Sequence, residues 1–271
     1  MSDYRFFQVD AFAERPLSGN PAAVMPMDAF ADDATLQAIA AENNLAETAF
    51  LVAEGEGVWR LRWFTPTLEV PLCGHATLAS AHVLYEHLGF DGPEVGFETR
   101  SGRLTVKRVA DGRLEMDFPS TPPQRVDAPA GLAEALGAPP REVWAASYLM
   151  AIYDTAAVVR ALSPDHRAIK PIASAAVGGG RGNVICAAPG DGGYDVVSRF
   201  FAPGSGIDED PATGSAHCII APYFSALLGK DELRCFQAFP GRGGDIVTRM
   251  AGDRVKLTGR ARTVIEGVFR V

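Results

Sequence analysis

Residues 62–82, RWFTPTLEVPLCGHATLASAH, lead from an aromatic strand end through a short loop into a helix of small residues. Residues 199–217, RFFAPGSGIDEDPATGSAH, repeat this order about half a chain later. The loop from the proline to the glycine spans 8 positions in the first copy and 11 in the second. Such self-similarity indicates a duplicated structural unit, although aromatic strand ends and glycines before helices also coincide by chance.

Strand and helix patterns alternate on both sides of these two segments. Alternating or aromatic-rich stretches predict strands, among them 4–12 (YRFFQVDAF), 47–54 (ETAFLVAE) and 156–162 (AAVVRAL). Apolar residues at helical spacing predict helices at 32–44, 73–89 and 212–229. Pro222 is expected to bend or break the last of these helices. This mixture is typical of an α+β fold in which helices pack on mostly antiparallel sheets.

A cluster of prolines, STPPQRVDAPAG at residues 120–131, divides the chain near its middle. We therefore expect an N-terminal half, residues 1–122, with Glu47 and the CGH helix. The C-terminal half, residues 123–271, contains the DPATGS helix, and its final strand is free to return to the first half. With 271 residues, of which 47% are hydrophobic, the chain has ample apolar material for two cores.

Composition excludes several classes of function. The net charge of −8 argues against a nucleic-acid binder, which needs a basic surface. No run of eighteen apolar residues predicts a membrane span, and the N-terminus shows no signal-peptide pattern. The four cysteines form no CxxC pair, which is typical of a reduced protein without disulfides or zinc motifs. We therefore expect a cytoplasmic protein that binds neither nucleic acid nor membrane.

No motif in the sequence predicts a metal or a cofactor. The histidines have no metal-ligand spacing, and the glycine-rich segment 178–182 lacks the lysine of a phosphate-binding loop. The acidic clusters Asp32-Asp33 and Asp208-Glu209-Asp210 have no histidine close by. We interpret them as charge at helix starts and solvated loop residues.

Both copies of the repeated segment end at the start of a predicted helix, near Gly74 and Gly214. A helix N-terminus presents unpaired N–H groups and about half a positive charge, so it binds a carboxylate without arginine. If the two starts face one cleft, an acidic protein can still bind a small anionic substrate. His75 lies in the first turn of its helix, where the dipole is expected to lower its pKa.

Four segments together resemble the phenazine-biosynthesis PhzF-like family, whose fold is that of diaminopimelate epimerase. They are SGNPAAV (18–24), NNLAETAFL (43–51), the CGH segment 62–82 and FFAPGSGIDEDPATGSAH (200–217). The resemblance implies two pseudo-symmetric, β-barrel-like halves, each around a central helix, with the active site between them. It also implies a cofactor-free isomerase of a small carboxylate or amino-acid-like substrate, commonly a homodimer.

The same resemblance assigns roles to particular residues. The family's acid/base is the glutamate of the ETAF segment, here Glu47, and His75 and Asp210 complete the catalytic group. The substrate-binding positions are Asn20, Gly74, Thr213, Gly214 and Ser215. From the residues alone, Glu47 could equally lie at an exposed strand edge, and Asp210 and Ser215 could simply cap or turn the chain.

Two other functions remain open from the sequence. Epimerases of this fold use two opposed thiols, and Cys73 stands at the first thiol position. The corresponding place in the second half is assigned to Asp210-Pro211-Ala212, which lacks a cysteine, so a two-thiol racemase is disfavoured. A racemase that uses Cys73 with Glu47 is one alternative, and a non-catalytic small-molecule or protein-binding module is the other.

Overall fold

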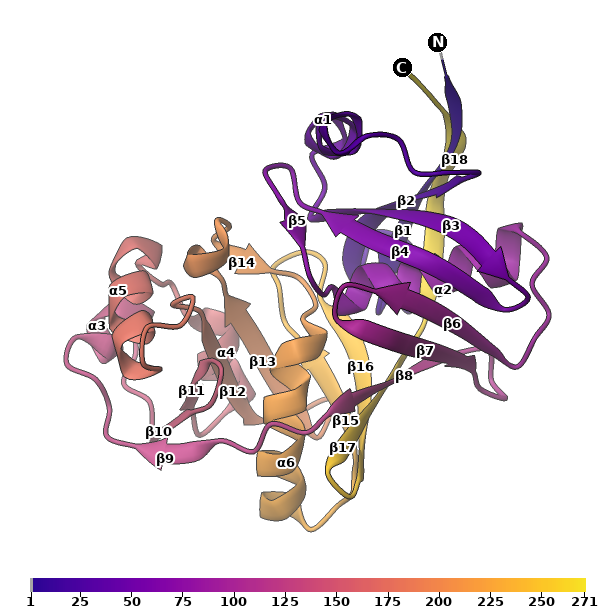
Figure 1. Cartoon of the computed structure of the whole chain (residues 1–271). Helices are drawn as coiled ribbons and strands as arrows, with labels where there is room; N and C mark the ends of the chain where they lie inside the picture. Colours follow the sequence, from indigo (N-terminus) through magenta and orange to yellow (C-terminus); the bar gives the residue numbers. More distant parts are fainter. Residues whose placement is uncertain (1) are drawn as a thin grey trace. The chain divides into compact units, whose positions relative to one another are not determined.

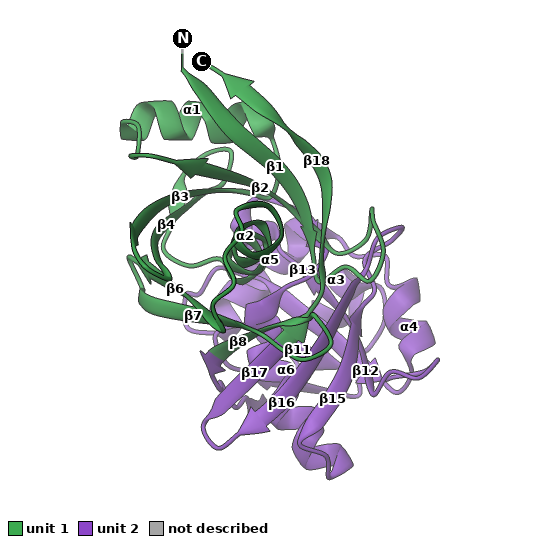
Figure 2. Cartoon of the chain, turned by 90° about the vertical axis from the view of Figure 1, so that its right-hand side faces the viewer, with its two compact units in different colours: residues 1–117, 258–271 green, residues 118–257 purple. Residues whose placement is uncertain are grey.

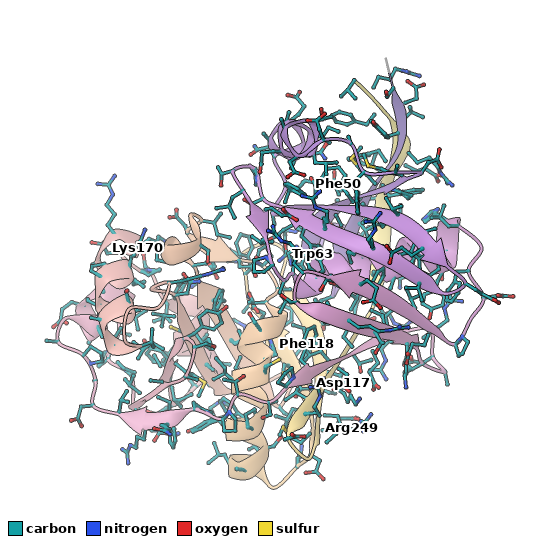
Figure 3. The ribbon with its side chains drawn as sticks, in the orientation of Figure 1. Phe50, Trp63, Asp117, Phe118, Lys170 and Arg249 are labelled. Atoms are coloured by element: carbon teal, nitrogen blue, oxygen red, sulfur yellow. The ribbon has the colours of Figure 1, made fainter. Side chains whose placement is uncertain are left out.

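The computed structural model describes residues 2–271, and the chain divides into two compact units. Unit 1 comprises Met1–Asp117 and Thr258–Val271, and unit 2 comprises Phe118–Leu257 (Figure 2). Asp117 and Phe118, where the chain leaves unit 1, follow each other on one strand (Figure 3). The proline cluster at residues 120–131 predicts a division after residue 122.

Unit 1 is a curved sheet with two helices (Figure 1). Its strands are β1 (Asp3–Ala11), β2 (Asn20–Met27), β3 (Glu47–Gly55), β4 (Val58–Phe64), β5 (Glu69–Val70), β6 (Glu94–Thr99), β7 (Gly102–Arg108), β8 (Leu114–Pro119) and β18 (Ala261–Arg270). The helices are α1 (Asp33–Asn43) and α2 (Gly74–His87). Pairing is antiparallel except between β2 and β3 and between β4 and β6, which are parallel.

Helix α2 is the centre of unit 1. Small and aliphatic residues, including Ala76, Leu78, Ala79 and Ala81, are fully buried along it. The strands of unit 1 curve around the helix (Figure 2), and β1, β2 and β3 contact it directly. A helix that is apolar all round is stable only when it is covered on all sides, which this arrangement provides.

Unit 2 contains a second sheet with more helices. Its strands are β9 (Gln124–Val126), β10 (Glu142–Ala145), β11 (Leu149–Ile152), β12 (Val184–Pro189), β13 (Val196–Phe201), β14 (Glu209–Asp210), β15 (Glu232–Gln237), β16 (Gly244–Ala251) and β17 (Arg254–Gly259). Its helices are α3 (Leu132–Leu136), α4 (Ala156–Ala161), α5 (His166–Ala176), the 3-10 turn η1 (Pro203–Ser205) and α6 (Gly214–Leu228). The buried face of α6 packs in a core with β11, β12, β13 and β15.

The two units repeat one order of pairing. In unit 1, β3 pairs antiparallel with β4, β4 with β5, and β4 parallel with β6 across α2. In unit 2, β12 pairs antiparallel with β13, β13 with β14, and β13 parallel with β15 across α6. The predicted α+β architecture of two similar halves is confirmed, and the repeated segments occupy equivalent positions in them.

An ion pair explains why both repeated segments begin with arginine. Arg62 on β4 binds Glu69 on β5 through Nε and Nη2, with N–O distances of 2.8 and 2.9 Å. Arg199 on β13 binds Glu209 on β14 in the same way, at 2.7 Å for both contacts. The expectation that Glu209 is a solvated loop residue is therefore wrong, because this side chain is 10% exposed and paired.

Two local predictions are corrected by the structure. Residues 156–161 form α4 rather than a strand, and the side chain of Thr155 caps the helix by accepting from the N–H of Val158. Helix α6 continues without a break through Pro222 to Leu228. None of the helices in the described part of the chain is long and apolar enough to cross a membrane.

Candidate active site

Glu47, Cys73 and His75 meet at the start of α2 in unit 1. Glu47 is the first residue of β3, and Cys73 is the N-cap residue of α2. Nε2 of His75 lies 3.0 Å from Oε2 of Glu47, and Nδ1 lies 3.5 Å from Sγ of Cys73. Glu47 thus lies against a helix start and is not at an exposed strand edge, since its side chain is 17% exposed.

Asn20 holds the opposite side of the His75 ring. Its Nδ2 lies 3.2 Å from Nδ1 of His75, and both residues are buried. The tight turn before β2 places Asn20 there, because Gly19 has a φ of +66° and a Cβ at that position would lie 2.1 Å from the carbonyl oxygen of Ala11. The predicted substrate-binding residue Asn20 is therefore part of the same cluster as Glu47 and His75.

The electrostatics of this cluster differ from the expectation for His75. Burial lowers the pKa of His75, whereas Cys73 and Glu47 raise it. The two raising effects together are larger, so the pKa of His75 is well above 6.5. The prediction of a lowered pKa is wrong, because a carboxylate at 3.0 Å outweighs the helix dipole. Burial and the nearby Glu47 raise the pKa of Cys73 to about 11, so this side chain is a neutral thiol near pH 7.

Asp210, Thr213, Gly214 and Ser215 lie together at the start of α6 in unit 2. Thr213 is the N-cap residue, and its hydroxyl donates a hydrogen bond to Oδ2 of Asp210. Gly214 begins the helix, and Oγ of Ser215 lies 3.2 Å from the Tyr148 hydroxyl. The first N–H groups of a helix have no partner within it, so this start has the donors that a carboxylate needs.

Gln237 on β15 organises this second group and was not predicted from the sequence. Its Oε1 accepts from the N–H of Thr213 at 2.9 Å, and its Nε2 donates to the carbonyl of Asp210 at 2.6 Å and to the Thr213 hydroxyl at 3.1 Å. The side chain is 1% exposed. Its position in a strand far along the chain carries no motif, so only the fold reveals it.

The repeat identifies which residues of unit 2 correspond to those of unit 1. Cys73 and Thr213 are both N-cap residues with extended backbone, directly before Gly74 and Gly214. The sequence-based assignment of Asp210-Pro211-Ala212 to the place of Cys73 is therefore wrong, and Thr213 fills it. A thiol at one helix start is matched by a hydroxyl at the other.

In unit 2, the position that corresponds to Glu47 is occupied by a residue that cannot act as an acid or a base. Thr48 pairs with Phe64 on β4, and Val184 pairs with Phe201 on β13, so Glu47 corresponds to Asn183. Asn183 is held by the N–H of Gly204 at 3.0 Å and donates to the Ser205 hydroxyl at 2.8 Å. The ionisable carboxylate of this position therefore belongs to unit 1, while unit 2 uses the position to hold a turn.

The structure thus assembles the predicted site residues into two groups. Asn20, Glu47, Gly74 and His75 lie together in unit 1, and Asp210, Thr213, Gly214 and Ser215 lie together in unit 2. Each group lies at the start of the central helix of its unit. The first group contains a carboxylate in contact with a histidine, and the second contains a carboxylate that accepts from the hydroxyl of Thr213.

Similar proteins of known family match this chain along nearly its whole length. The family model described as phenazine biosynthesis-like protein matches residues 9–267. An uncharacterized isomerase of Pseudomonas aeruginosa is 46% identical, with 98% of each chain covered. The crystal structure of a phenazine biosynthesis protein of the PhzF family from Enterococcus faecalis is 37% identical, covers 100% of both chains and superposes with a TM-score of 0.93.

A more distant likeness concerns the fold alone. A hydroxyproline epimerase from Agrobacterium vitis, solved with bound trans-4-hydroxy-L-proline, is 13% identical, with a TM-score of 0.59 over 98% of this chain and 92% of that one. The architecture is therefore shared with amino-acid epimerases. The match along nearly the whole length shows that this chain belongs to the phenazine biosynthesis-like protein family.

Proposed function

We propose that the protein is a cofactor-independent isomerase that moves a proton on a small carboxylate or amino-acid-like substrate, with Glu47 as the acid/base. The observation that carries this proposal is the pairing of Glu47 with His75 at the start of α2, with 3.0 Å between Oε2 and Nε2. A carboxylate held by a fixed imidazole has a defined orientation, which proton transfer requires. Similar relatives are named as uncharacterized isomerases, which supports the same class of reaction.

The reaction is a shift of one proton between two carbons of the substrate. Glu47 accepts a proton from an activated C–H bond, and the electron pair of that bond delocalises into the substrate. Glu47 then returns the proton to another carbon on the same face, so no proton or electron is gained overall. His75, whose raised pKa favours the cation, stabilises the negative charge that develops between the two steps.

Binding roles are assigned to the remaining residues of each group by itself. The N–H groups at Gly74 in unit 1 and at Gly214 in unit 2 are each suited to bind a carboxylate oxygen, because they lie at the N-termini of α2 and α6. The hydroxyl of Ser215 adds a hydrogen bond, and Thr213, whose hydroxyl donates to Asp210, holds that carboxylate so that it orients the substrate. Asn20 holds His75 and contributes a polar wall.

A racemase that uses thiol bases is less well supported. Thr213 occupies the position in unit 2 that corresponds to Cys73, so that position has no thiol. Cys73 itself has a pKa of about 11, raised by burial and by Glu47, and a neutral thiol is a poor base at pH 7. The one-carboxylate mechanism therefore accounts better for the residues present.

The proposal is tested by a metabolite screen in deuterated water. The purified protein is incubated with pools of small carboxylates and amino acids, without added cofactor, and deuterium incorporation is followed by mass spectrometry. We expect the isomer of one substrate to accumulate and to carry deuterium at carbon wherever the carboxyl proton of Glu47 exchanges with solvent before it is returned. Binding of a metabolite with neither isomerisation nor exchange at carbon would instead favour a non-catalytic binding module.

A further inference from the structure

The cluster at the start of α2 contains three different metal-ligating side chains. A carboxylate oxygen of Glu47, Sγ of Cys73 and a ring nitrogen of His75 all lie within 4.8 Å of one another. Glu47 is contributed by β3 and the other two by the start of α2, so Glu47 is far in the sequence from Cys73 and His75. Motif spacing could not reveal this combination, which the fold creates.

The separations between these atoms suit a tetrahedral ion. Zn–S and Zn–N bonds of about 2.3 and 2.0 Å place the two ligand atoms roughly 3.5 Å apart in tetrahedral geometry. In the structure, Sγ of Cys73 lies 3.5 Å from Nδ1 and 4.0 Å from Nε2 of His75. Nε2 of His75 lies 3.0 Å from Oε2 of Glu47. One ion binds one ring nitrogen, so Nε2 is the ligand atom of His75, and Sγ of Cys73 must move closer to Nε2 and to the Glu47 carboxylate by up to about 1 Å.

We propose that Glu47, Cys73 and His75 form a Zn²⁺-binding site and that bound Zn²⁺ inhibits the isomerase. Thiolate and imidazole are ligands preferred by zinc, whereas Mg²⁺ and Ca²⁺ prefer oxygen ligands. The thiolate and the carboxylate together carry two negative charges, which balance the ion. On binding, the thiol of Cys73 and the imidazolium of His75 each lose a proton to solvent, as sulfur and Nε2 each donate an electron pair to the metal.

The positions and exposure of the three side chains favour the binding of an ion. Cys73 occupies the N-cap position of α2, but its side chain makes no capping hydrogen bond, so Sγ is not committed to the helix. When Nε2 of His75 binds the ion, Nδ1 carries the ring proton, and the amide of Asn20, whose Nδ2 lies 3.2 Å from Nδ1, turns its oxygen to accept that proton, the role of an outer-shell residue in metal sites. The side chain of Glu47 is 17% exposed, which gives the ion a route from solvent.

Inhibition rests on the proposed function, whereas metal binding does not. A carboxylate of Glu47 bound to Zn²⁺ cannot accept a substrate proton, and His75 loses its contact with that carboxylate. The ion has three protein ligands, so a fourth position is left for water or for a substrate carboxylate. The site therefore takes a thiophilic divalent cation in competition with catalysis.

The test uses Co²⁺ as a spectroscopic probe on the full-length, metal-free protein. We expect one equivalent of Co²⁺ to produce a thiolate-to-metal charge-transfer band, and Zn²⁺ to displace it. Cys73→Ala should abolish the band and weaken Zn²⁺ binding by more than about 100-fold. Cys218→Ala removes another buried cysteine, in α6, and should leave both unchanged.

Glu47→Gln provides a second variant that keeps the thiol and the shape of the side chain. It should retain the charge-transfer band but bind Zn²⁺ at least about tenfold more weakly. Co²⁺ binding without a charge-transfer band, or equal Zn²⁺ affinity in all variants, would overturn the zinc site while leaving the isomerase untouched. Zinc binding in a protein that catalyses no exchange would contradict the proposed function alone.

Discussion

Cys73 is the residue whose role the sequence and the structure describe differently. The sequence places it where epimerases of this fold have a catalytic thiol. The structure places its sulfur against His75 and close to Glu47, with a pKa raised to about 11 by burial and by that carboxylate. In the proton transfer proposed for Glu47, this thiol is a neighbour of the acid/base pair and does not move the proton.

Cys73→Ser should therefore keep most of the isomerase activity. Serine has nearly the same size and is a favoured N-cap residue, so α2 still begins at Gly74. We expect kcat/KM to fall by less than about tenfold, whereas loss of a group that transfers the proton costs roughly 10²–10⁴-fold. Steady-state kinetics measures the change, and a loss of several orders of magnitude would favour a thiol-base racemase.

The sequence could predict the identity of the site residues better than their environment. Glu47, His75 and Asp210 lie in short motifs, so the family resemblance finds them. The pKa of His75 could not be predicted, because it depends on the contact with Glu47 from another element. Gln237 was missed for the same reason, since β15 brings it to the start of α6 without any local signal.

At the scale of elements, one strand–loop–helix unit is built twice around an arginine–glutamate pair. Its copy in unit 2 is the more buried, with side chains of Arg199 and Glu209 6% and 10% exposed. Nη1 of Arg199 also donates to the carbonyl of Leu162 at 2.7 Å. The pair therefore joins β13 and β14 directly next to Asp210, the last residue of β14.

Arg199→Ala should destabilise the protein strongly. The substitution leaves the carboxylate of Glu209 buried without its partner, which costs about 3–5 kcal/mol. Denaturant unfolding measures the change in the free energy of unfolding. Arg160→Ala is the matched control, because Arg160 pairs with Asp191 at 2.7 Å with both side chains largely in solvent. A similar midpoint shift in both variants would contradict the importance of the buried pair.

His217, in the first turns of α6, makes the stability of the protein depend on pH. Its Nδ1 lies 2.8 Å from the carbonyl of Thr213, and burial lowers its pKa from 6.5 to about 4. The unfolded chain therefore binds the proton more readily, so stability from His217 is complete above pH 6.5 and is lost as the pH falls toward 4. His82 in unit 1 has the same lowered pKa of about 4, again mainly from burial.

The free energy of unfolding should accordingly fall between pH 6.5 and 4. His217→Asn keeps a donor near Nδ1 and removes the titration, so it should reduce the loss by up to roughly 3 kcal/mol. Urea unfolding at several pH values gives the slope of the free energy of unfolding against pH for the wild type and for the His217→Asn variant. An unchanged slope in the variant would mean that His217 does not carry this dependence.

Element order was predictable where local pattern and packing agree. The helices α2 and α6 were expected because small apolar residues follow a glycine in both copies. Helix α4 was missed because Val158 and Val159 favour a strand locally, while the Thr155 cap and the burial of Val159 favour a helix. The role of Glu209 was missed because its partner lies on another strand.

At the scale of the whole molecule, the chain leaves unit 1 after Asp117 and returns to it at Thr258. The returning strand β18 pairs with β1 from Asp3 to Ala11, so the ends of the chain complete one sheet. The sequence suggested this return because its last residues alternate as a strand does, but the pairing partner depends on the complete fold.

We expect two chains to associate in solution, as the family resemblance implies. Light scattering coupled to size exclusion should then give the mass of two chains of 28.8 kDa each. A mass that stays at one chain across the accessible concentration range would contradict this prediction. The assignment of Glu47 would be unaffected, because its contacts come from unit 1 of one chain.

The proton transfer by Glu47 is tested most directly by deuterium exchange in three proteins side by side. Wild type, Glu47→Gln and Glu54→Gln are incubated with the same carboxylates in deuterated water, and thermal unfolding verifies that each is folded. Glu54 is the matched control, because it is an exposed carboxylate on the same strand β3. We predict equal exchange in wild type and Glu54→Gln and a loss of roughly 10²–10⁴-fold or more in Glu47→Gln, because the amide keeps the shape but cannot carry the proton. A folded Glu47→Gln protein that exchanges as fast as wild type would contradict the account.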